Sequence, residues 1–304
     1  MWKRALPLTL LVPLSCAYGQ SQTPAPSQTQ LPEFRASVNR VNVLITATDN
    51  KGRLITDLAQ EEFHVYEDGK LQQITNFSRQ TELPLAVGFL IDTSSSVSTK
   101  LSFEKEASTN FIYSVMRDND RALLVEFDTG VTLLQDLTSS ANEIVRKIAK
   151  LKTGGGTSLF DAIYEVVTKK LKDLPDRKAI VILSDGADQN SKTTLDEVLE
   201  TVRRADVILH IISTSAYGAS GDHAGDKALL KLAEETGGRV YFPYTASQME
   251  QYFDAINKEL RSQYNIAYQP TNNKKDGAYR SIEIKMKRDN IKLRHKKGYR
   301  VQGS

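Results

Sequence analysis

The chain has 304 residues, of which 40% are hydrophobic and 25% are charged, and its formal net charge is +3. These proportions are typical of a globular protein that folds in water, and they exclude a disordered chain and a protein made mainly of membrane spans. The nearly balanced charge argues against a general nucleic-acid-binding protein. The length predicts one large domain and a smaller module.

Residues 1–19 have the pattern of a secretory signal peptide. Lys3 and Arg4 precede an apolar run that ends in Ala-Tyr-Gly, so we expect cleavage after Gly19. Cys16 permits an alternative, a lipoprotein with its lipid on that cysteine, but the residues before it fit the processing signal poorly. Cleavage would remove the only cysteine, and a cysteine-free chain suits a bacterial periplasm or exterior. We therefore expect a secreted or periplasmic protein, with no other apolar stretch long enough to cross a bilayer.

The next two segments predict a linker and the first part of a β module. Residues 20–33 are rich in Gln, Ser, Thr and Pro and have almost nothing to bury, which predicts a disordered linker. Residues 34–82 alternate apolar and polar positions, with strands expected at 63–67 and 72–77 around the turn Asp68-Gly69. This segment is the expected N-terminal part of a small β-sandwich.

The texture changes near Leu85, where four near-continuous apolar runs (LAVGFLI, ALLVEF, AIVILS and VILHIIS) alternate with helical segments. Such runs are typical of strands buried on both faces, so residues 83–263 predict a Rossmann-like, doubly wound and mostly parallel sheet. Capping-box spacing marks two helix starts, at Ser140 and at Thr194. Helices are expected near 98–117, 139–151, 158–174, 193–206, 226–237 and 247–263.

Residues 264–304 again have the sequence pattern of β-strands. Ile282, Ile284 and Met286 alternate with charged residues, and such strands cannot bury an apolar face alone. We expect them to complete the sandwich begun by residues 34–82, with the α/β domain inserted between the two parts. Residues 279–301 also carry nine Lys or Arg against two acids, which we interpret as a solvated strand face.

Three short motifs predict a cation site. The strand from Leu85 ends at Asp92, and an extended loop after it would present Asp92, Ser94 and Ser96 on one side. Thr157 follows three glycines, and Asp185 lies in a Ser-Asp-Gly turn after another buried strand. Ligand sites in open α/β sheets lie at the carboxyl edge, where these loops meet. Carboxylate and hydroxyl oxygens are ligands for Mg²⁺, Mn²⁺ or Ca²⁺.

Each motif alone has an ordinary structural interpretation: a helix N-cap cluster, a glycine turn and a strand-ending turn. Their occurrence in this order favours the cation site. Asp128 and Asp188 also lie near strand ends, but we interpret them as structural and leave them outside the site.

With these motifs, DxSxS, a Thr after a Gly-rich loop and an Asp in a DG turn, the chain resembles the von Willebrand factor type A (VWA) family. The resemblance covers residues 84–262, and the flanking β segments look like those of a bacterial exported subgroup. It implies a metal-ion-dependent adhesion site (MIDAS) for Mg²⁺, or for Mn²⁺ or Ca²⁺. Ser94 and Ser96 would be direct ligands, and Asp92, Thr157 and Asp185 would ligate directly or through water.

The resemblance implies an exported, metal-dependent, adhesion-type module that binds a protein ligand through an Asp or Glu of the partner. Alternatives are a cell-envelope assembly or chaperone-like adaptor that uses the same site and a metal-dependent phosphatase. A haloacid-dehalogenase-type phosphatase would need Asp at position 94, where Ser stands, and nucleophile-elbow and phosphate-binding motifs are absent. We therefore predict no catalytic residue, leave the oligomeric state open, and hypothesise that the last helix of the α/β domain transmits ligand binding to the β module.

Overall fold

The structure is a computed structural model that describes residues 40–79, 84–215, 224–301 and 303. The predicted signal peptide and linker, and the first residues of the β module, lie outside the described residues. The described residues belong to one compact unit. None of the helices within these ranges is long and apolar enough to cross a membrane.

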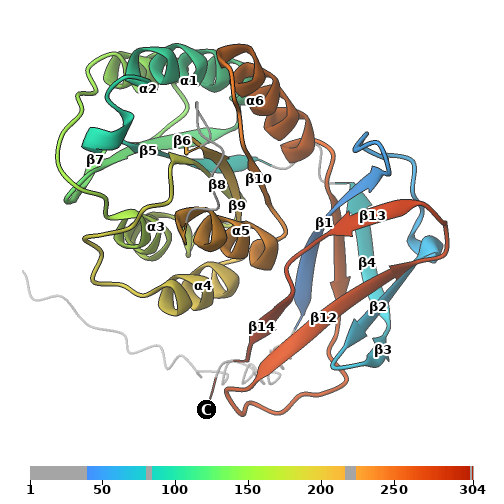
Figure 1. Cartoon of the computed structure of the whole chain (residues 1–304). Coiled ribbons are helices and arrows are strands. Elements are labelled where there is room, and N and C mark those ends of the chain that lie inside the picture. Colours follow the sequence, from blue (N-terminus) through green and yellow to red (C-terminus); the bar gives the residue numbers. More distant parts are fainter. Residues whose placement is uncertain (1–39, 80–83, 216–223, 302, 304) are drawn as a thin grey trace, which may run out of the picture. The chain divides into compact units, whose positions relative to one another are not determined.

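The central domain is built on a six-stranded sheet in the order β10-β9-β8-β5-β6-β7 (Figure 1). Five strands run parallel and β7, at one edge, is antiparallel to β6. Every residue of β5, and every residue of β9, is buried, as the continuous apolar runs predicted. The strands are β5 (Leu85–Asp92), β6 (Arg121–Phe127), β7 (Val131–Thr138), β8 (Arg177–Ser184), β9 (Val207–Ser213) and β10 (Arg239–Tyr241).

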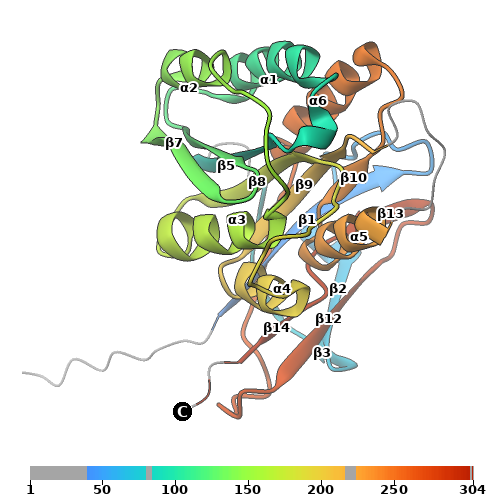
Figure 2. The same cartoon turned by 60° about the vertical axis from the view of Figure 1, so that its left-hand side comes forward.

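Helices cover both faces of this sheet, and Figure 2 shows it between the two layers. One face packs against α1 (Leu101–Val115), α2 (Ala141–Ile148) and α6 (Ala246–Leu260). The other packs against α3 (Leu159–Val166), α4 (Leu195–Arg204) and α5 (Ala224–Thr236). The predicted doubly wound sheet is therefore confirmed, and all six expected helices are present.

Some local expectations were wrong. Strands β7 and β10 were not predicted, because β7 lies at a sheet edge and its burial does not alternate, and because β10 is only three residues long. Thr194 forms the expected capping box with Glu197, but Ser140 makes no side-chain cap bond. Instead, the carboxylate of Glu143 accepts a hydrogen bond from the hydroxyl of Thr138, the last residue of β7, at 2.6 Å. In the expected capping box this carboxylate would have bonded to Ser140.

The chain segments on either side of the α/β domain form two four-stranded antiparallel sheets, β13-β1-β11-β4 and β14-β12-β2-β3. Strand β11 lies between β1 and β4, and β12 lies between β14 and β2, so each sheet joins both ends of the described chain. The strands are β1 (Val41–Asp49), β2 (Phe63–Glu67), β3 (Lys70–Gln72), β4 (Ile74–Arg79), β11 (Tyr264–Tyr268), β12 (Tyr279–Met286), β13 (Ile291–Arg294) and β14 (Gly298–Arg300).

One apolar core joins the two sheets, with Val43 and Ile45 from one and Val65 and Ile284 from the other. The expected β-sandwich assembled from both ends is thus confirmed. The strand expected at 72–77 is divided: β3 pairs with β2, whereas β4 crosses to the other sheet and pairs with β11. A single continuous strand could not serve both sheets.

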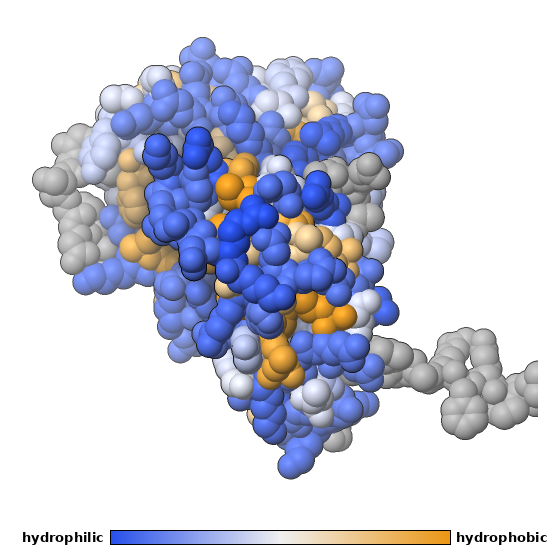
Figure 3. All heavy atoms as spheres, turned by 90° about the vertical axis from the view of Figure 1, so that its right-hand side faces the viewer, coloured by the Kyte–Doolittle hydropathy of each residue, from blue (hydrophilic) through white to orange (hydrophobic). Residues whose placement is uncertain are grey.

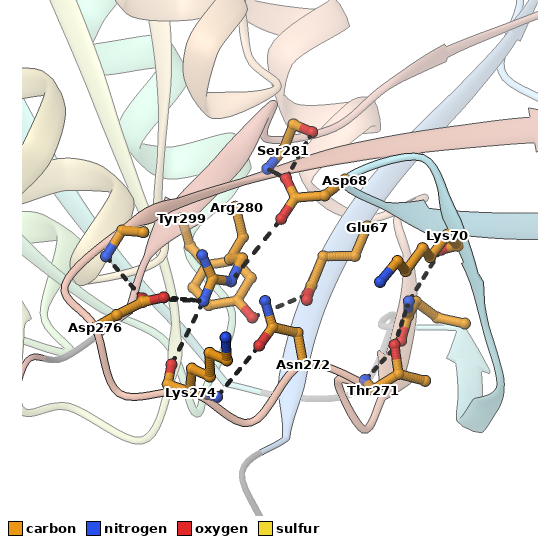
Figure 4. Close-up of polar contacts among 12 residues, drawn as sticks. Glu67, Asp68, Lys70, Thr271, Asn272, Lys274, Asp276, Arg280, Ser281 and Tyr299 are labelled. Atoms are coloured by element: carbon orange, nitrogen blue, oxygen red, sulfur yellow. Dashed lines mark hydrogen bonds and ion pairs between the residues drawn. The ribbon is translucent and has the colours of Figure 1, made fainter.

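A polar cluster closes one end of the sandwich (Figure 4). Arg280, with its side chain 5% exposed, donates to both carboxylate oxygens of Asp276 at 2.9 Å and lies 3.9 Å from Asp68. Beside it, the buried Glu67 accepts hydrogen bonds from the hydroxyls of Tyr268 and Tyr299, at 2.7 and 2.9 Å. This cluster fixes the loop before β12 to the β2–β3 turn.

The basic C-terminal stretch has two roles. On β12, Glu283 and Lys285 lie opposite the buried Ile282 and Ile284, as expected, but Arg280 is buried on the same face as these two isoleucines. The face of the β module in Figure 3 is mainly hydrophilic, with small separate apolar patches. Farther along, however, basic residues pair with acids of the α/β domain. These pairs are Arg294 with Glu259, Lys296 with Asp206, Lys297 with Glu234 and Arg300 with Glu200. The solvated-face interpretation is therefore wrong for Arg280, which is buried and paired with Asp276, and for residues 294–300.

Candidate metal centre

The three predicted motifs lie on neighbouring loops at the carboxyl edge of the six-stranded sheet. Strands β5 and β8 are adjacent and parallel, so Asp92 at the end of β5 and Ser184 at the end of β8 leave the sheet side by side. The glycine loop packs against the residues that follow Asp92, because Gly154 N–H donates to the carbonyl of Thr93 at 2.8 Å and Ser95 N–H donates to the carbonyl of Gly155 at 3.2 Å.

Asp92 is 1% exposed and is held through both carboxylate oxygens. Its Oδ1 accepts the backbone N–H of Ser94 at 2.9 Å, and its Oδ2 accepts the hydroxyl of Ser184 at 2.7 Å. Ser184 Oγ in turn accepts the N–H of Gly186 at 3.0 Å. Ser184 was not identified from the sequence, although it immediately precedes Asp185.

The two serines link the first motif to the third. Ser94 Oγ lies 3.0 Å from Ser96 Oγ, and Ser96 Oγ donates to Asp185 Oδ2 at 2.8 Å. The loop is not extended as predicted, because Ser95–Val97 form a short 3₁₀ helix. This turn nevertheless brings Ser96 back beside Ser94, and it leaves Ser96 exposed to solvent while Ser94 is buried.

Thr157 reaches the same edge in a different way. Its side chain is buried, and its position is fixed by backbone contacts: its N–H donates to Asn190 Oδ1 at 3.1 Å, and its carbonyl accepts from Gln189 and Asn190. The loop before it is held by the hydroxyl of Thr129, which accepts the N–H of Gly156 at 2.8 Å. Neither Asn190 nor Thr129 carried a sequence signal, since both lie in loops distant along the chain.

Two glycines have steric reasons to be present. Gly155 has a φ of +73°, a conformation that residues with a Cβ rarely adopt. At Gly156 a Cβ would lie 2.1 Å from Asn190 Oδ1. The loop therefore packs directly against the residue that positions Thr157.

Asp128 and Asp188 have local structural contacts, in keeping with their exclusion from the site. Asp128 accepts the N–H of Gly130 at 3.0 Å in the β6–β7 turn. Asp188 accepts the hydroxyl of Ser191 at 2.7 Å and the N–H of Phe160 at 3.3 Å.

The donor set fits a hard cation. Burial raises the pKa of the Asp92 carboxyl, hydrogen bonds from Ser184 and Ser94 oppose this effect, and the charge of Asp185 raises the pKa further. A bound cation would favour the ionised form of both carboxylates. Within the described ranges, no group of three or more His, Cys, Asp and Glu side chains is arranged to hold a metal. Such a site would therefore depend on hydroxyl oxygens, which suit Mg²⁺ or Mn²⁺.

An open pocket of about 580 Å³ adjoins this edge. Asp185, Asp188 and Lys100 line it, together with Phe160, Ala187 and Ala228. Ser96 and Asp185 thus lie where an outside molecule can approach them, while Asp92 lies below in the protein.

These features define an open α/β domain with a cluster of oxygen-bearing side chains at the carboxyl edge of its parallel strands. The chain belongs to the von Willebrand factor type A domain family, whose sequence profile matches residues 86–255. The matched range extends from β5 into α6 and includes every residue of the three motifs.

Proteins similar to this chain come from human, from Catenulispora acidiphila and from a mussel. A human protein, von Willebrand factor A domain-containing protein 3B, is 26% identical over 159 residues, which cover 50% of this chain but only 11% of the human protein. A von Willebrand factor type A structure from Catenulispora acidiphila superposes with a TM-score of 0.52 at 13% identity, covering 89% of this chain and 76% of that one. The mussel byssus proximal thread matrix protein 1, with a zinc-occupied MIDAS motif, has a TM-score of 0.51 at 16% identity, covering 63% and 49%. At these identities the structural likeness concerns the fold.

Proposed function

We propose that this protein binds a partner protein through a divalent cation held by Asp92, Ser94, Ser96, Thr157 and Asp185. The observation that carries the proposal is the chain of contacts from Asp92 through Ser94 and Ser96 to Asp185, which gathers oxygen donors from two adjacent strand ends. When bound, a divalent ion would supply a Lewis-acidic position for a carboxylate of the partner.

The five proposed ligands differ in how far they are buried. Asp92 is buried and accepts a hydrogen bond from Ser184, so its carboxylate is held in position before any partner protein binds. Ser96 is exposed and Asp185 is partly exposed, so they form the side that faces a ligand. A partner that presents Asp or Glu at this edge would contact the adjoining pocket with its neighbouring residues.

Metal binding is the first test. Calorimetric titration of Mg²⁺, Mn²⁺ and Zn²⁺ into the full chain is compared with a double variant, Asp92→Ala with Asp185→Ala. A control, Asp128→Ala, removes an aspartate near a strand end that makes a local contact in the β6–β7 turn. We expect Mg²⁺ and Mn²⁺ binding in the parent and the control and its loss in the site variant. A folded parent that binds none of these ions would overturn the proposal.

Partner binding is the second test. Candidate partners are measured against immobilised protein in Mg²⁺ and then in EDTA, and each Asp or Glu of the bound segment is replaced by Asn or Gln. We expect binding to require both the cation and one acidic residue. A partner whose binding is unchanged by EDTA and by every such replacement would contradict the acidic-ligand mechanism.

We also propose that the protein acts outside the cytoplasm, because of the signal peptide predicted over residues 1–19. Mass spectrometry of protein from the native host tests this point. A secreted or periplasmic chain that begins after Gly19 would support it, and a cytoplasmic chain that retains Met1 would contradict it.

A further inference from the structure

Helix α1 carries a buried acid, Glu104, just behind the proposed metal centre. The residue lies in the first turn of the helix, and its N–H donates to the carbonyl of Lys100. Its side chain is 1% exposed, and neither carboxylate oxygen has a hydrogen-bond partner. A buried carboxyl without hydrogen bonds is destabilising, so a packing role alone gives no reason for an acid here.

The charges around Glu104 belong to the proposed centre. Burial raises the pKa of its carboxyl to about 8, and the negative charges of Asp92 and Asp185 add to this effect, while Lys100 opposes it. Lys100 itself donates to the backbone carbonyl of Thr214 at the end of β9. The same edge of the sheet therefore holds three carboxylates and one lysine.

Including Glu104 makes the sum of the charges at the proposed centre zero when a divalent ion is bound. When a bound divalent ion brings all three carboxylates to their ionised form, they carry three negative charges, of which Lys100 offsets one and the ion offsets the other two. A low-dielectric site favours such neutrality, because an uncompensated charge there is costly. The three acids do not form a group that could ligate one metal directly, so Glu104 would act through its charge.

We propose that Glu104 is a positioning residue of the cation site, whose buried negative charge, added to those of Asp92 and Asp185, strengthens the binding of a divalent ion. This inference rests on the proposed metal-binding function and adds a third acid to its residues. Outer groups that hydrogen-bond to the ligands of a metal typically contribute a factor of about 10 to 100 to its affinity, and we expect an effect of the same order from the Glu104 charge, which acts without such a hydrogen bond.

The experiment compares Mn²⁺ affinity in full-length variants, measured by calorimetry and by the electron paramagnetic resonance signal of free Mn²⁺. Glu104→Gln removes the charge and keeps the shape, and we expect the Kd to rise roughly 10- to 100-fold. Ser108→Ala is the matched control, because Ser108 lies one turn later on the same face of α1, is fully buried, and also has a hydroxyl without a hydrogen-bond partner. We expect its Kd to stay within threefold of the parent value.

Circular dichroism establishes that each variant is folded, and Glu104→Met, an apolar replacement of similar length, takes the place of Glu104→Gln if the latter does not fold. If the parent binds Mn²⁺ and the charge-removing variant binds it within threefold, the role of Glu104 is wrong while the metal site stands. If the folded parent does not bind Mn²⁺ at all, the proposed site and this inference both fail.

Discussion

The guanidinium of Arg261, directly after α6, is paired with the buried carboxylate of Asp120, directly before β6. Asp120 also accepts the N–H of Leu85 at 2.9 Å and the N–H of Arg117 at 2.9 Å. One carboxylate therefore joins the point where the chain enters the α/β domain to the point where it leaves. This is the junction at which the domain is inserted into the β-sandwich.

Replacing Asp120 with Asn should strongly destabilise the protein. The side chains of Asp120 and Arg261 are 4% and 9% exposed, so the variant would leave a buried guanidinium without its counter-charge. We expect a loss of about 3 to 5 kcal/mol in the free energy of unfolding, measured by urea titration. As a control, Glu200→Gln affects the more exposed pairs with Arg204 and Arg300 and should cost less than about 1 kcal/mol for each. Equal losses for the two variants would contradict this account.

A second prediction concerns the glycine loop. Gly156→Ala places a methyl group against Asn190, which positions Thr157, whereas Gly154→Ala meets no atom within 4 Å. We expect Gly156→Ala to weaken Mg²⁺ binding by about tenfold or more through displacement of Thr157, by analogy with other supporting residues of metal sites. Gly154→Ala should bind Mg²⁺ like the parent. Similar calorimetric affinities for the two variants would show that this loop does not position a ligand.

The architecture could be predicted because the core strands have clear hydrophobic patterns, either continuous or alternating. Four apolar runs marked the core strands, and the alternation from Ile282 to Met286 marked a half-buried strand. The edge strand β7, whose burial does not alternate, and the three-residue strand β10 give no such signal. The division of residues 72–77 between two sheets depends on long-range pairing with β2 and β11, which local patterns do not encode.

The candidate site was predictable only in part, for a similar reason. The three motifs stand out as short polar segments after buried strands, but their supporting residues do not. Ser184 lay within a motif and was overlooked, Asn190 and Thr129 act through contacts between loops, and Glu104 looks like an ordinary helix acid until its burial is known. The ion pairs of residues 294–300 were likewise hidden, because their partners lie far away in the chain.

A third prediction concerns acid stability. His210 on β9 is fully buried, and neither ring nitrogen has a hydrogen-bond partner. Burial lowers its pKa below the ordinary value of 6.5, although Glu259, 3.9 Å away, opposes this effect, and Arg294 and Arg239 lower the pKa further. The unfolded chain therefore takes up a proton that the folded chain does not, so stability is full above pH 6.5 and falls below it.

The contribution of His210 should be about 1.4 kcal/mol per pH unit below pH 6.5, until its folded-state pKa is reached. His210→Gln removes the titrating group. We expect the variant to lose less unfolding free energy than the parent between pH 6.5 and pH 5, by urea titration at each pH. Parallel stability curves for the two proteins would mean that His210 takes up its proton in the folded state as readily as in the unfolded chain.

The last prediction follows from the sandwich being built from both ends of the described chain. Strand β11 is central in one sheet and β12 is central in the other, so a chain that ends at Gln263 keeps β1, β2 and β4 but loses their main partners. The apolar face of β1, including Val43 and Ile45, would then be uncovered. We expect limited proteolysis to cut residues 40–79 rapidly in the truncated chain, while fragments of residues 85–263 persist, because the α/β core and the Asp120–Arg261 pair remain intact. If residues 40–79 are as well protected in the truncated chain as in the full chain, the N-terminal strands form a stable unit by themselves. The β-sandwich would then not depend on the strands that follow the α/β domain.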